Sequence, residues 1–106
     1  MLPPIKKLRA RKQAVLEKDI ERKVCEYARS RSFLVYKFVS PQIIGVPDRI
    51  FISPAGVLTF IEFKRPGETT RSSQDREIAR LRKHNQRVYI IDDVEQGKAI
   101  VDAITF

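Results

Sequence analysis

Residues 45–64, which read GVPDRIFISPAGVLTFIEFK, decide the fold of this chain. Residues 49–53 and 57–63 are rich in β-branched and aromatic side chains, which is typical of strands. Residues 54–56, Pro-Ala-Gly, form a turn signal, because proline presets its own φ and glycine tolerates positive φ. A link this short predicts that the two strands pair as an antiparallel hairpin.

The segments beyond this hairpin extend it into a larger sheet. Residues 33–39, FLVYKFV, predict a strand that ends at Ser40 and Pro41. Downstream, residues 87–91, RVYII, predict a fourth strand. A helix between the third and fourth strands would make that connection a crossover, which favours parallel pairing and a right-handed path.

Three helices complete the pattern. The first is predicted over residues 15–31, where apolar side chains recur at spacings of three and four: Leu16, Ile20, Val24, Tyr27 and Ala28. The second is predicted to run to Lys83 from Ser72 or Ser73, either of which could cap it, and Asn85 can close it in the left-handed conformation. The third is predicted over residues 94–104. The predicted order is αβββαβα, an α/β fold with a four-stranded mixed sheet flanked by helices.

Length and composition indicate one domain. A chain of 106 residues with 42% hydrophobic content suits a single core, which we predict over residues 15–106. Residues 1–14 contain two prolines and five cations and predict a flexible basic arm, with helix as an alternative toward its end. Such an arm could contact phosphates or remain a solvated tail.

The charge balance favours a polyanionic partner. Lysine and arginine number 21 against 13 acids, which gives a formal net charge of +8, and nucleic acid is the first candidate. The single cysteine excludes an internal disulfide and a cysteine-rich zinc site, and the single histidine argues against a histidine-cluster metal site. No apolar run approaches the ~20 residues that span a bilayer. We therefore expect an intracellular protein without a membrane partner.

Three charged residues meet at one end of the hairpin. Glu62 and Lys64 occupy positions i and i+2, so strand alternation places both on one face of the sheet. The hairpin brings Asp48 beside them. Taken singly, Asp48 would be a turn residue, and Glu62 with Lys64 a solvent-facing ladder. Their joint placement beside Gly45 and Pro47 favours a site instead.

This set suits metal-dependent hydrolysis of a phosphodiester. Mg²⁺ or Mn²⁺ prefers oxygen ligands, which Asp48, Glu62 and the backbone carbonyl of Phe63 could supply. The metal would acidify a bound water and offset charge on the phosphate. Lys64 could orient or deprotonate that water, or stabilise the oxyanion. Glu17 and Glu21 lie along the edge of the first helix's apolar stripe, so either could be a further acid near the metal.

The sequence also indicates supporting residues around this centre. Gln74 shares a helical face with Ile78 and Leu81, and a core-facing glutamine needs polar partners, which a site at the sheet's edge would provide. Lys37 and Ser40 could contact phosphate or simply belong to the sheet surface. A basic region around the second helix adjoins the site and could bind DNA. Its candidate DNA contacts are Arg65, Arg71 and Arg76.

From Glu17 to about Ile104, the chain resembles the virus-type replication-repair nuclease (VRR-NUC) family of the PD-(D/E)xK superfamily. Four features carry the resemblance: Gly-Val-Pro-Asp at residues 45–48, Glu-Phe-Lys at residues 62–64, Gln74, and the Glu17-x-x-Ile20-Glu21 pattern. One departure is Asn85, where the family commonly has a glycine, and asparagine also visits the left-handed region.

The resemblance implies both a fold and an activity. It implies a restriction-endonuclease-like domain and a metal-dependent, structure-selective DNA endonuclease for branched or flapped DNA, with Holliday junctions among its possible substrates. Its catalytic residues would be Glu21, Asp48, Glu62, Lys64 and Gln74, with Glu21 at a second metal site or acting through a water. Similarity to archaeal-type junction resolvases favours Glu21 over Glu17, because Glu21-Arg22 followed by Ser32-Phe33 fits their spacing.

The resemblance also implies a homodimer and a phage or prophage origin, and a two-fold dimer would supply the two sites that a symmetric junction needs. A second hypothesis is a non-catalytic DNA-binding module with the same fold. The intact acidic set argues against it, because a binding module has no need of acids within a basic surface. A third hypothesis, an RNA-binding protein, lacks a recognisable aromatic stacking motif.

Overall fold

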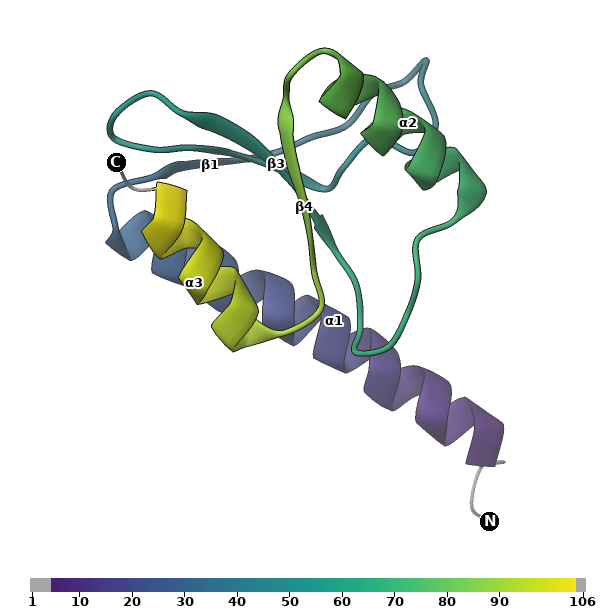
Figure 1. Ribbon diagram of the computed structural model, residues 1–106. Coiled ribbons are helices and arrows are strands. Elements are labelled where there is room, and N and C mark those ends of the chain that lie inside the picture. The colour runs from purple at the N-terminus through teal and green to yellow at the C-terminus, as the bar shows by residue number, and fades with distance from the viewer. Residues whose placement is uncertain (1–4, 105–106) are drawn as a thin grey trace.

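A computed structural model describes the backbone of residues 5–104 and the side chains from residue 16 to residue 104. The described chain forms three helices and one sheet (Figure 1). In chain order these elements are α1 (Ile5–Ser30), β1 (Leu34–Lys37), β2 (Arg49–Ile52), β3 (Leu58–Phe63), α2 (Ser72–Lys83), β4 (Arg87–Ile91) and α3 (Val94–Ile104). The predicted αβββαβα order and α/β class are confirmed.

The four strands lie in the order β1-β2-β3-β4. The first three pair antiparallel, and β3 pairs parallel with β4 through the α2 crossover, as the connection predicted. In the hairpin Arg49 stands opposite Ile61, and in the parallel pair Glu62 stands opposite Ile90. The charged end of β3 therefore lies in the middle of the sheet, with a neighbouring strand on each side.

Helices cover both faces of the sheet, α1 and α3 on one and α2 on the other (Figure 1). The larger core lies under α1 and α3, where residues such as Val24 and Val101 pack against Phe51 and Ile61. A smaller cluster of Phe60, Ile78 and Val88 lies under α2. Alternate residues of β3 thus enter different cores, which fixes the register of the strand that carries Glu62.

Two local predictions need correction. Helix α1 begins at Ile5 rather than near Val15, so it runs through most of the segment predicted as a flexible arm, while residues 1–4 of that segment lie outside the described residues. The N-cap of α2 is Arg71, not a serine, and its backbone N–H donates to the side-chain oxygen of Gln74 at 2.9 Å. Asn85 closes α2 with φ 61°, as predicted.

Among the described residues, no helix combines the length and the apolar character that crossing a membrane requires.

Candidate active site

The β2–β3 hairpin places Asp48 beside Glu62. Asp48 directly precedes β2, and because Arg49 pairs with Ile61, Asp48 falls opposite Glu62 one step further along. The backbone N–H of Phe63 donates to Oδ2 of Asp48 at 2.9 Å. This hydrogen bond ties one carboxylate oxygen to the β3 backbone and fixes the aspartate against the strand that carries the other acid.

Glu62 and Lys64 are far more buried than a solvent-facing ladder would be, with relative exposures of 2% and 4%. Their charged groups lie close together, with Lys64 Nζ 3.6 Å from Glu62 Oε2. Strand alternation therefore places both on one face, as predicted, but inside the protein. A buried ion pair of this kind is costly to desolvate, which points to a role other than stability.

Gln74 holds the same oxygen of Glu62 from the other side. Its Nε2 donates to Glu62 Oε2 at 2.9 Å, while its Oε1 accepts the N–H of Arg71 at 2.9 Å. Both ends of this buried amide are therefore engaged, as expected for a core-facing glutamine. The start of α2 is thereby fastened to the acidic end of β3.

The second carboxylate oxygen of Glu62, Oε1, is buried and has no hydrogen-bond partner. Burial, together with the charge of nearby Asp48, raises the pKa of Glu62 to about 7, while Lys64 acts to lower it. Burial also raises the pKa of Asp48, with the Phe63 N–H acting to lower it and Glu21 to raise it. The two acids disfavour each other's charge, a conflict that a bound cation would relieve.

These residues fit a hard divalent cation. The donor set consists of one unpartnered carboxylate oxygen on Glu62 and the carboxylate of Asp48, and Mg²⁺ commonly binds through one or two carboxylates while keeping several waters. Within the described residues, no three histidine, cysteine or acidic side chains gather closely enough to hold a metal by themselves. Water and backbone oxygens, such as the carbonyl of Phe63, would have to complete the coordination.

The two acids of α1 have different surroundings. Glu21 accepts a hydrogen bond from Nε of Arg49 at 2.8 Å, and its charge raises the pKa of Asp48. The pKa of Glu17 is itself raised, first by burial and then by Glu68, and Glu17 in turn raises the pKa of Glu62. Both glutamates therefore influence the site electrostatically. Glu21 raises the pKa of Asp48, and Glu17 raises the pKa of Glu62.

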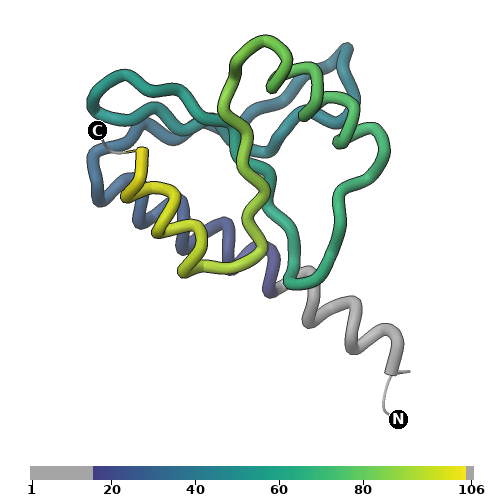
Figure 2. The backbone as a smooth tube through the Cα atoms, in the orientation of Figure 1, coloured from purple at the N-terminus to yellow at the C-terminus, as the bar shows by residue number. Residues whose placement is uncertain are grey.

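The sequence interpretation missed Glu68, in the loop that joins β3 to α2. Its Oε1 lies 3.8 Å from Nζ of Lys64, and it also forms an ion pair with Arg65. The loop passes next to α1 (Figure 2), in agreement with the effect of Glu68 on Glu17. The spacing of four residues between Lys64 and Glu68 was a signal, but such spacing predicts contact only in a helix.

The residues predicted to bind DNA are spread around this centre. Arg65 and Arg71 begin and end the β3–α2 loop, and Arg76 projects from α2. Lys37 is exposed at the end of β1. Oγ of Ser40 accepts the N–H of Ile43 at 3.2 Å, so this hydroxyl shapes the loop before Asp48. Of these residues, Arg65 is the nearest along the chain to the acidic centre, because it directly follows Lys64.

Gly45 locks the loop before Asp48 against α2, which leads to a prediction. Its φ is +92°, and a Cβ there would lie 2.4 Å from the backbone oxygen of Ser73. We expect Gly45→Ala to lower the free energy of unfolding by about 2–4 kcal/mol, adding the left-handed backbone cost to that of overpacking. Urea unfolding would measure this change in the free energy of unfolding.

Gly56→Ala is the matched control, because its φ is also positive while no atom lies within 4 Å of its Cβ position. An equal loss in both variants would mean that the close packing contributes nothing.

Comparison with known proteins adds two findings, although no protein-family model matches the chain. A curated protein of Acyrthosiphon pisum secondary endosymbiont phage 1, named "Putative nuclease p44", is 40% identical over 78 residues, which are 74% of this chain and 84% of that protein. A solved structure described as "VRR_NUC domain" aligns with a TM-score of 0.78 and 26% identity, over 84% of this chain and 97% of that one. Both likenesses extend over most of each protein compared.

Proposed function

This chain belongs to the VRR-NUC family of nucleases, and we propose that it is an endonuclease that cuts DNA with the help of Mg²⁺ or Mn²⁺. The observation that carries the proposal is the buried, unpartnered Oε1 of Glu62 beside Asp48. A buried carboxylate oxygen without a partner is costly, and a cation at this position would satisfy it. The net charge of +8 supports DNA as the partner.

We assign each residue of the site a role. Asp48 and Glu62 would hold the metal, which supplies an acidified water and a counter-charge for the phosphate. Gln74 donates to Oε2 of Glu62, so Oε1 is the oxygen that would bind the cation. Lys64, held between Glu62 and Glu68, would orient the attacking water and stabilise the charge that develops on the phosphate.

Glu21 is proposed as the acid of α1 that acts beside the metal, through a water or at a second metal position. We expect Glu21→Gln to weaken Mg²⁺ affinity about 10- to 100-fold, the usual cost of losing a group that supports metal ligands. Glu17→Gln should cost less, because Glu21 rather than Glu17 is paired with Arg49 next to Asp48. Cleavage rates over a Mg²⁺ titration would measure both. A larger loss of Mg²⁺ affinity from Glu17→Gln would mean that Glu17, and not Glu21, is the acid of α1 that acts beside the metal.

DNA contacts are proposed for four cations, Lys37, Arg65, Arg71 and Arg76, and for the hydroxyl of Ser40. Branched or flapped DNA is the proposed substrate class, with four-way junctions included. Because salt competes for phosphates, binding through these cations should weaken steeply as ionic strength rises.

A homodimer is proposed as the active form. Leu34 and Tyr36 of the edge strand β1 are 54% and 52% exposed, and Leu58 lies in the same row of the sheet as Leu34 and Ile52. This apolar part of the sheet lies beside a strand edge that a second copy of β1 could pair with. Sedimentation equilibrium should give twice the mass of one chain, 12.3 kDa, and Leu34→Asp should halve it. A monomer at ~10 µM would contradict the dimer.

The test of the function uses labelled four-way junction, flap and continuous duplex DNA. We expect cutting with Mg²⁺ or Mn²⁺ and none with chelator. Preference among the three DNAs would define the substrate. Salt-sensitive binding without cutting under either metal would contradict the nuclease proposal and favour a DNA-binding module.

A further inference from the structure

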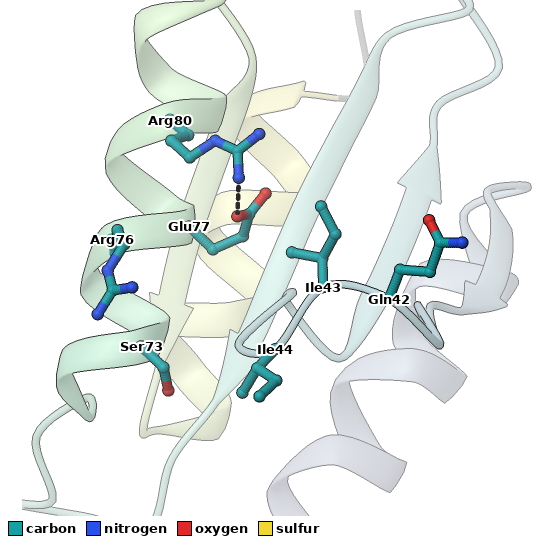
Figure 3. A pocket seen from close by; sticks show the side chains of 7 residues that line it. All are labelled: Gln42, Ile43, Ile44, Ser73, Arg76, Glu77 and Arg80. Carbon is teal, nitrogen blue, oxygen red and sulfur yellow. Dashed lines mark hydrogen bonds and ion pairs between the residues drawn. The ribbon is translucent and has the colours of Figure 1, made fainter.

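A cleft of about 420 Å³ lies between the loop before Asp48 and helix α2 (Figure 3). Ile43 and Ile44 line it from the loop, and Arg76, Glu77 and Arg80 line it from the helix. Its volume lies within the ~300–1,000 Å³ of ordinary ligand pockets. The loop wall is thus aliphatic apart from Gln42, and the helix wall carries two cations, an acid and Ser73.

The aliphatic wall is held in place although it faces solvent. Ile44 is 82% exposed, yet its loop is fastened on both sides. The N–H of Ile43 donates to Oγ of Ser40, and Gly45 packs against the backbone of Ser73. A large aliphatic side chain on a fixed loop can act as a wedge against a base pair, as apolar side chains do in several DNA-binding proteins.

The opposite wall combines a nearly buried carboxylate with two arginines. Glu77 is only 9% exposed, and its Oε2 accepts a hydrogen bond from Arg80 at 3.3 Å. A carboxylate repels a phosphate but accepts hydrogen bonds from exocyclic amino groups such as N4 of cytosine. Arg76 and Arg80 can stack on a base or contact the neighbouring phosphates. The cleft therefore matches a nucleobase with its sugar-phosphate at the mouth.

The cleft is also at a suitable distance from the acidic centre. Gln74, which holds Glu62, lies on the same helix one turn before Glu77. At 1.5 Å of rise per residue, Glu77 is about 4.5 Å and Arg80 about 9 Å further along the axis. Stacked nucleotides are spaced by about 3.4 Å. A base in the cleft would therefore be one to three nucleotides from a phosphate at Asp48 and Glu62.

We propose that this cleft binds an unpaired nucleobase of the DNA strand that is cut, with Ile44 packed against the end of the adjoining duplex. The inference rests on the proposed function and adds the feature of DNA that is selected. A base inside a duplex has both faces covered by its neighbours and its amino edge paired. Only an unpaired base can enter between the aliphatic and arginine walls, so the strand to be cut carries one near a branch.

The test combines the removal of a base from the DNA with the removal of a side chain that lines the cleft. Binding of flap DNA is measured by fluorescence anisotropy with Ca²⁺ in place of Mg²⁺, using DNA with an abasic nucleotide at each of the three positions next to the branch. We expect one abasic position to weaken binding by wild-type protein about tenfold, the order of one stacking contact. The abasic nucleotide should weaken binding by Ile44→Ala protein little, because that variant has already lost the aliphatic contact with the base.

Two exposed residues outside the cleft provide matched controls: Val39→Ala removes an aliphatic side chain, and Lys83→Ala removes a cation of α2. Both should keep the full effect of the abasic position. An equal abasic effect in wild-type and Ile44→Ala protein would overturn the inference while leaving metal-dependent cutting intact. Failure of wild-type protein to cut any DNA would overturn the proposed function as well, so the two failures are distinguishable.

Discussion

Asp48→Asn is expected to lower the rate of DNA cleavage by about 10³-fold or more. Asparagine keeps the volume of the side chain and an oxygen that can accept the N–H of Phe63, so the hairpin should keep its geometry. What is lost is one of two negative charges for the cation. Metal stabilisation of the transition state is worth several kcal/mol, and each ~1.4 kcal/mol is tenfold in rate.

Single-turnover cleavage over a wide range of Mg²⁺ would measure this loss, and the thermal unfolding midpoint would confirm that the variant is folded. Asp19→Asn is the matched control, since Asp19 lies on α1 and, among the side chains that the structure describes, forms ion pairs only with its helical neighbours Arg22 and Lys23. Cleavage by Asp48→Asn within tenfold of wild type would remove Asp48 from the metal site.

Lys64→Ala should give a comparable loss of cleavage rate without changing the Mg²⁺ requirement, because the lysine is not proposed as a ligand.

The centre of the site was predictable because it depends on local geometry. Strand alternation alone puts Glu62 and Lys64 on one face, and a short hairpin brings Asp48 to the same end. The burial of these charges was not predictable, because it arises when α1 and α2 close over opposite faces of β3. Gln74 was indicated by the helical period, but its partner Glu62 comes from a contact between separate elements.

Other features depended on competition between local effects. Residues 1–14 were interpreted as an arm because of Pro3, Pro4 and their charge. Lysine, arginine, leucine and alanine are nevertheless strong helix formers, and the helix extends through residues 5–14. Ser72 and Ser73 are good caps, but Gln74 satisfies the N–H of Arg71 and moves the cap upstream. The 3.6-residue period puts Glu17 and Glu21 on one face of α1, so periodicity cannot separate them.

The stability of the metal-free protein should fall as pH rises. Burial raises the pKa of Glu62 from 4.5 to about 7, so folding disfavours its charged form. The stabilisation from the neutral form is complete below pH 4.5 and is lost as pH rises through about 7. A shift of this size corresponds to about 3 kcal/mol, at 1.36 kcal/mol for each pKa unit. The raised pKa values of Asp48 and Glu17 act in the same direction.

Urea unfolding with chelator at pH 5, 6, 7 and 8 would measure this slope, which Glu62→Gln should largely remove because a neutral amide replaces the acid. Added Mg²⁺ should restore stability at pH 8 in wild type but much less in Glu62→Gln, since binding to the folded state alone stabilises it. This readout is independent of DNA cleavage. If the fall of stability with pH persists in Glu62→Gln, other acids than Glu62 cause it. A slope that disappears in Glu62→Gln, together with no Mg²⁺ effect on wild type, would mean that the buried carboxylate is strained without being a metal ligand.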